Sequence, residues 1–107
     1  FMHYQGRSRE ASTCLEESVA IARSLLDKET AVRILTTLVA MEIVWENEMK
    51  ATLFAPEGFE LAQEFGTVPL IALALDTLGD VFLFRGAYEQ AKSSFENSLV
   101  IWVMNLQ

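Results

Sequence analysis

The sequence has few of the residues that interrupt or crosslink a chain, and little positive charge. Its 107 residues include two prolines, five glycines and one cysteine. So few prolines and glycines predict long regular elements. A single cysteine excludes an internal disulfide, and we therefore expect a reducing, cytoplasmic location. Acidic residues outnumber basic ones by 15 to 8, which would repel a phosphate backbone, so we expect no nucleic-acid partner.

Long apolar runs are also missing. No apolar run approaches the roughly 20 residues that a membrane span needs, so we expect no membrane partner. The opening FMHYQGRSRE lacks the charged-then-apolar profile of a signal peptide. A hydrophobic content of 51% with 21% charged residues is typical of a globular domain. The first residues already have helical character, and we interpret the chain as a fragment of a larger protein.

What the sequence does contain is an internal repeat. The segment Gly6–Ala22 aligns with Gly86–Trp102 at an offset of 80 residues, and at half of that offset it aligns with Glu46–Ala62. Repeats of this length predict stacked supersecondary units. We divide the chain into a partial first copy (1–26), a second copy (27–66) and a third copy (67–107). The same small residue stands at one position of all three copies: Ala11, Ala51 and Ala91.

Each copy is predicted to be a pair of helices, so the fold class is all-α. The spacing of large apolar residues in the third copy follows a helical period. Gly86, Gly6 and the pair Glu46-Asn47 are predicted to end the first helix of each copy, with Asn47 suited to the left-handed conformation. Thr67 is a candidate N-cap. The apolar stripe of the third copy consists of Ile71, Leu75, Leu78 and Phe82.

Small residues in the third copy are predicted to let helices approach closely. We expect Gly79 and Ala91 to face each other where the two helices cross, and Ser98 to lie where the next helix comes near. The second copy departs from this pattern. It has three residues of a different size or polarity at equivalent positions: Val39, Glu42 and Ala55. Since an unpaired buried carboxylate is costly, we expect Glu42 to reach solvent or to pair with a neighbouring repeat, and a ligand-sensing carboxylate is the alternative.

These residues resemble the tetratricopeptide repeat (TPR). The resemblance lies in a large residue followed by Leu-Gly, an aromatic, Gly-x-Tyr, Ala, an aromatic and a small residue, which here run from Leu75 to Leu99. The usual unit has about 34 residues, so units of about 40 are similar to the lengthened ones of large bacterial signalling proteins, including ATP-dependent transcriptional regulators. The resemblance implies a right-handed α-α superhelix with a concave inner face.

In that family the first helix of each pair lines the inner face. Carried over position by position, the resemblance implies a largely apolar wall with one cation and an acidic end. Its residues would be His3, Tyr4, Arg33, Thr36, Ala40, Ile43, Val44, Leu73, Asp76, Asp80, Leu83 and Phe84.

The resemblance also bears on the partner. Some members hold a C-terminal carboxylate in a clamp of Lys, Asn and Arg, which this sequence lacks, and Asp76 and Asp80 would repel such a group. An apolar or basic helical segment fits the wall better. We also expect the apolar ends of the repeat stack to meet another copy of the chain, giving a homo-oligomer.

We predict no enzyme activity, metal or cofactor, because no catalytic or phosphate-binding motif is present. His3 stands alone, Asp76 and Asp80 lack a third ligand, and Cys14 is expected to be packed. Trp45 and Trp102 are expected to pack between repeats.

The sequence therefore favours a protein–protein interaction module within a larger bacterial regulator. Two alternatives remain open. One is an effector-sensing segment of an ATP-dependent transcriptional regulator, and the other is a structural spacer or self-association surface.

Overall fold

The computed structural model describes residues 2–25, 27–65 and 67–105, with side chains from residue 9 onward except that of residue 65. Over these residues the chain is all-helical and has no strand, which confirms the predicted fold class. The long helices agree with the scarcity of proline and glycine. They are α1 (Met2–Ser24), α2 (Lys28–Val44), α3 (Glu48–Phe65), α4 (Val68–Phe84) and α5 (Tyr88–Asn105).

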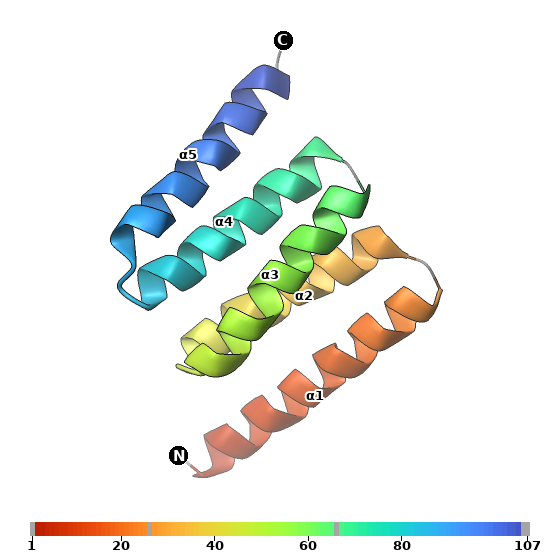
Figure 1. Ribbon diagram of the computed structural model, residues 1–107. Helices are drawn as coiled ribbons and strands as arrows, with labels where there is room; N and C mark the ends of the chain where they lie inside the picture. The colour runs from red at the N-terminus through yellow and green to blue at the C-terminus, as the bar shows by residue number, and fades with distance from the viewer. Residues whose placement is uncertain (1, 26, 66, 106–107) are drawn as a thin grey trace.

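The helices fold back and forth, each running roughly antiparallel to the one before, with α1 and α5 at opposite ends (Figure 1). Every helix packs against its neighbours in sequence, and α2 also packs against α4. The result is a slab that measures 49 × 36 × 18 Å. The direct contact between α2 and α4 is what brings two of the predicted inner-face helices together.

The turn after α2 and the turn after α4 use the same hydrogen bonds at positions 40 residues apart. Asn47 N–H donates to the carbonyl of Glu42 and Ala87 N–H to that of Phe82, both at 2.8 Å. Both turns contain a residue in the left-handed region, with φ of 59° at Glu46 and 79° at Gly86. Such a residue lets the last carbonyls of a helix be satisfied. The predicted role of Gly86 is thereby confirmed.

In the second copy the left-handed residue is Glu46, and the prediction that favoured Asn47 was wrong. The side chain of Asn47 instead accepts a long bond (3.5 Å) from the backbone N–H of Lys50, in the first turn of α3. Asparagine is well suited to this position because its side-chain oxygen can satisfy a free N–H group at a helix start. Glu46 bears the steric cost that glycine avoids at the equivalent position.

The predicted turn at Gly6 is not present, because α1 runs unbroken from Met2 to Ser24. A glycine inside a helix costs only about 1 kcal/mol relative to alanine, so Gly6 by itself does not end the helix. His3 and Tyr4 therefore belong to the first turns of α1, and their side chains lie outside the described residues.

The interior is built from α2, α3 and α4 together. Leu35 and Leu38 of α2 are 1% and 0% exposed. Two clusters of buried side chains each draw on all three helices. Burial of this kind is the main stabilising contribution in a helical protein. The clusters consist of Val32, Ala62, Leu70 and Ala74, and of Val39, Ala51, Ala55 and Val81.

The small residues of α4 and α5 make room for different neighbours from those predicted. A Cβ atom on Gly79 would lie 2.5 Å from the ring of Phe95, so this glycine accommodates Phe95 as its nearest neighbour and not Ala91. Ser98 faces the preceding helix, where its Oγ donates to the carbonyl of Ala72 (3.2 Å). The prediction that Ser98 lies where the next helix comes near was therefore wrong.

Candidate protein-interaction face

Helices α2 and α4 together form an open hollow. It has a volume of about 330 Å³. Apolar side chains make up most of its wall, and one carboxylate stands among them. All of the lining residues are ones that the sequence had placed on an inner face: Ala40, Ile43, Asp80, Leu83 and Phe84.

The helical period explains why these residues meet. Ile43 and Leu83 are equivalent in the repeat, as are Ala40 and Asp80. Since α2 and α4 pack against each other, equivalent positions on the two helices form neighbouring rows. Leu83 is half exposed (50%), whereas Phe84 and Ile43 are partly buried. The hollow therefore offers accessible apolar surface that a partner side chain could cover.

The acidic character of this face comes from Asp76 and Asp80, one helical turn apart on α4. Partial burial raises the pKa of Asp80 above its ordinary value of 3.8, and the carboxylate of Asp76 raises it further. Two like charges four residues apart on a helix repel each other. A positively charged partner group would relieve that repulsion.

Arg33, the cation of the predicted wall, lies away from the hollow. Its guanidinium is exposed and stands 3.9 Å from the carboxylate of Glu29, one turn earlier on α2. Thr36 donates its hydroxyl to the carbonyl of Arg33 (2.8 Å). These two residues do not line the hollow, which occupies the C-terminal halves of α2 and α4.

The other predicted wall residues divide between core and surface. Leu73 packs against the cluster that contains Leu70, so it contributes to the core. Val44 is 70% exposed at the end of α2. Asp76 is half-buried and is not part of the lining of the hollow. The structure thus brings together five of the predicted residues.

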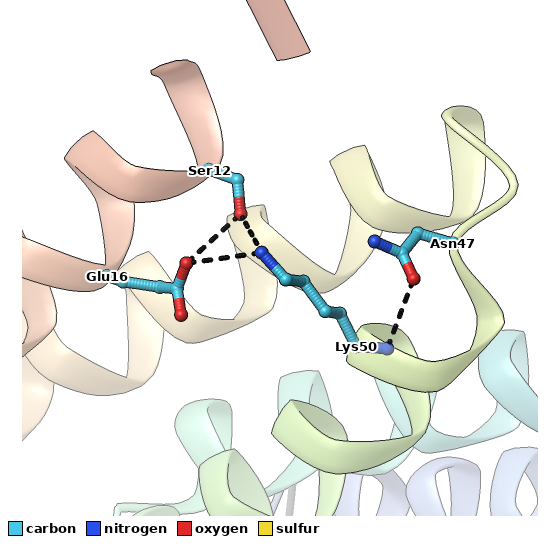
Figure 2. Close-up of polar contacts among 4 residues, drawn as sticks. All are labelled: Ser12, Glu16, Asn47 and Lys50. Carbon is cyan, nitrogen blue, oxygen red and sulfur yellow. Dashed lines mark hydrogen bonds and ion pairs between the residues drawn. The ribbon is translucent and has the colours of Figure 1, made fainter. Parts of the chain in front are cut away.

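A second polar feature, which the sequence analysis did not find, bridges α1 and α3. Lys50 donates from its Nζ to Ser12 Oγ (3.1 Å) and pairs with Glu16 (3.4 Å), as Figure 2 shows. Two turns further along α1, Arg23 pairs with Glu57 at 2.6 Å. These charges look in the sequence like an ordinary solvated helix face, and only the register of the two helices shows that they bridge.

Between the two bridges lies a crevice of about 240 Å³. Its floor includes Leu35 and Leu38 of α2, and Phe54 lies on the α3 side. The bridging residues are 34% to 43% exposed at their side chains, so each pair contributes little to stability by itself. Both pairs link side chains of α1 and α3 across the crevice.

Glu42 is the most unusual polar residue in the interior. It is 1% exposed, and its Oε1 atom has no hydrogen-bond partner among the described residues. The same is true of Thr52 Oγ1. A buried carboxylate oxygen without a partner is costly. Contrary to expectation, Oε1 of Glu42 neither reaches solvent nor pairs with another repeat within the part of the chain that is described.

Other single residues differ from expectation in their exposure. Cys14 is exposed, not packed as expected. Trp102 is 40% exposed and Trp45 partly buried. Over residues 2–25, 27–65 and 67–105, no helix is long and apolar enough for a bilayer crossing, and no group of three acidic, His or Cys side chains could hold a metal ion.

Comparison with known proteins gives no further identification: no protein-family model, no curated protein and no solved structure matches the chain.

Proposed function

We propose that the chain is a protein-interaction module whose α2–α4 face binds an apolar or basic helical segment of a partner protein. The observation that carries the proposal is the open hollow lined by Ile43, Leu83, Phe84 and Asp80. It combines accessible apolar surface with a carboxylate at its wall. Such a surface recognises an amphipathic helix by taking up its apolar side chains.

The mechanism would be surface presentation without bond chemistry. One apolar side chain of the partner would enter between Leu83 and Phe84 and cover Ile43. A lysine or arginine one turn away would pair with Asp80 and reduce its repulsion with Asp76. The apolar contact would supply most of the affinity, and the ion pair would favour basic over acidic segments.

A wider proposal concerns the architecture and setting of the module. We propose TPR-like hairpins stacked in a right-handed superhelix, within a larger cytoplasmic, bacterial regulator. The matching turns at Glu46 and Gly86 and the packing of α2 on α4 support the repeat. The sequence resemblance is the sole support for the bacterial regulator.

The two alternatives fit the α2–α4 face less well. An effector-sensing segment requires an enclosed site around Arg33 and Asp76, whereas the hollow is open and lies nearer the C-terminal ends of the helices. A structural spacer requires an evenly solvated face, whereas Ile43 and Phe84 are partly buried in a concave surface. Binding of a helical segment accounts for both features.

Two designed peptides test this proposal. One is an 18-residue amphipathic helix of leucine and lysine, and the other has glutamate in place of lysine. We expect fluorescence anisotropy to show binding of the lysine peptide only. Leu83→Glu should weaken that binding at least tenfold, and the double variant Asp76→Asn/Asp80→Asn several-fold.

The matched control is Glu60→Gln/Glu89→Gln, which removes the same charge from exposed positions on α3 and α5. It should bind the lysine peptide nearly as well as the unaltered chain does. Equal binding of the two peptides, or equal weakening by the two double variants, would contradict the proposed face.

A further inference from the structure

The outer face of α5 is unusually apolar and accessible. Its C-terminal half, residues 97–105, carries no charged side chain in the sequence NSLVIWVMN. Several large apolar residues there are 40% to 70% exposed. At 3.6 residues per turn they cover about 200° of the helix circumference. They are Leu99, Val100, Trp102, Val103 and Met104.

Comparison with the earlier helices divides this surface into two strips. The first strip consists of Leu99 and Trp102. The equivalent residues of α1, Val19 and Ala22, are 8% and 5% exposed, and α1 packs against α2. On α3 the equivalent Ala62 is buried in a cluster with α4 residues. The first strip is thus the position where a following helix packs in the earlier copies.

The second strip consists of Val100 and Met104, with Val103 between the two strips. On α3 the equivalent residues are Glu60 and Glu64, which are exposed and charged. Glu64 uses its charge to pair with Lys28 at 3.2 Å. Solvent and ion pairs therefore occupy this strip on α3, whereas α5 has apolar side chains there. A single helix docked on α5 as α4 docks on α3 would leave the second strip exposed.

We propose that a second copy of the chain covers both strips, with α5 packed antiparallel against its symmetry mate. The two-fold axis would pass close to Val103, the centre of the surface. The two α5 helices would then cross near Val103, so that the apolar strips of each copy face those of the other. An isologous contact of this kind is the commonest form of assembly.

A surface without charge is one where two copies of a strongly acidic chain can meet. The whole chain has a net charge of −7, so self-association would be opposed wherever like charges met. The two strips are the place on α5 where no charge would face its own copy. The charged residues of this helix, among them Lys92 and Glu96, lie in its N-terminal half, where they pair with each other at 3.9 Å.

The test is sedimentation velocity of the full chain from 1 to 200 µM. We expect a concentration-dependent dimer. Val100→Glu/Met104→Glu, which gives α5 the residues that α3 has at these positions, should weaken dimerisation at least tenfold. Both positions are exposed, so circular dichroism should show unchanged helix content.

The matched control is Met49→Glu/Leu53→Glu, which adds the same charges at exposed apolar positions of α3 (82% and 65%). Its dimerisation should equal that of the unaltered chain. In a Cys14→Ser background, Val103→Cys should form a disulfide-linked dimer on air oxidation and Leu53→Cys should not. Monomer at 200 µM, or equal weakening by the two double variants, would overturn the proposal. Because the α2–α4 face is not involved, peptide binding there would be unaffected by either outcome.

Discussion

The hairpin α2–α3 and the hairpin α4–α5 fill the space between their helices in opposite ways. In α4–α5, Gly79 leaves room for the ring of Phe95. In α2–α3 the equivalent positions hold Val39 and Ala55, which are 1% and 3% exposed and belong to one cluster. The larger residue of the pair is Phe95 on the second helix in α4–α5, but Val39 on the first helix in α2–α3. Total volume at a helix crossing is thus kept while its source changes, as close packing requires.

The two hairpins also differ in how many residues they contain that destabilise the backbone or the core. The α2–α3 hairpin has a glutamate at the left-handed turn position, a buried carboxylate at Glu42 and a proline inside α3. The α4–α5 hairpin has Gly86, Phe82 and Glu96 at the equivalent positions. The comparison predicts that placing residues of one hairpin at the equivalent positions of the other will raise or lower the free energy of unfolding.

The largest effect should come from replacing Gly79 and Phe95 by the valine and alanine of the α2–α3 hairpin. We expect Phe95→Ala to lower the free energy of unfolding by about 2–4 kcal/mol and Gly79→Val by about 1–3 kcal/mol, because its side chain would overlap the ring. The double variant, which reproduces the residues of α2–α3, should cost at least about 1 kcal/mol less than the sum. Urea unfolding measures the free energy for all three variants. Additive effects would contradict the claim that the two positions compensate each other in volume.

Pro56 gives the next prediction. It is exposed inside α3, where it has no N–H to donate to the carbonyl of Thr52 one turn earlier. A proline inside a helix costs about 3 kcal/mol. Pro56→Glu, which restores the residue found at Glu16 and Glu96, should raise the free energy of unfolding by about 2–3 kcal/mol in the same assay. Unchanged stability would show that the helix has already adapted to the proline.

Replacing Glu42 should have a smaller, stabilising effect. Since its Oε1 has no partner, Glu42→Met should raise the free energy of unfolding by about 1–2 kcal/mol, as removal of an unsatisfied buried polar group does. Glu42→Gln is the control that keeps the shape and removes the charge. A marked loss of stability in the methionine variant would indicate a partner for the carboxylate.

The smallest effect is expected at the N-cap residues, where α2 and α4 differ. The Asp27 carboxylate accepts bonds from the Thr30 hydroxyl (2.7 Å) and backbone N–H (3.1 Å), and these lower its pKa below 3.8. Its contribution to stability is therefore present above pH 3.8 and lost as the pH falls through the lowered value. Asp27→Ala should lower the thermal midpoint at pH 7 and have less effect near pH 2.

Thr67, the equivalent residue before α4, is the control for this prediction. It makes no side-chain capping bond, so Thr67→Ala should leave the thermal midpoint unchanged at both pH values. A loss on Asp27→Ala that is the same at pH 7 and pH 2 would contradict the role of the carboxylate.

Periodicity predicted the helices because it depends on local spacing. The stripe through Leu75 and Leu78 and the turn at Gly86 follow from the chain's own stereochemistry, and so does the all-helical class. Five residues of the candidate face were among those that the family resemblance implied, and four of them form two pairs at equivalent positions of α2 and α4. The prediction that Asn47 takes the left-handed conformation was wrong because glutamate, here Glu46, can also adopt it at a cost in free energy.

What could not be predicted depends on contacts between helices. Whether Gly79 faces Ala91 or Phe95 is decided by the register of α4 and α5, which sequence spacing does not fix. The bridges from Lys50 and Arg23 to α1 and α3 partners arise in the same way. The exposure of Cys14 depends on which side of α1 receives a neighbour.

The function proposed here depends on α2 and α4 presenting one shared face. Amide chemical-shift mapping during titration with the leucine–lysine peptide tests that claim most directly. The account predicts shifts concentrated at Ala40, Ile43, Asp80, Leu83 and Phe84. Shifts centred on α1, α3 or α5, or no shifts at saturating peptide, would contradict it.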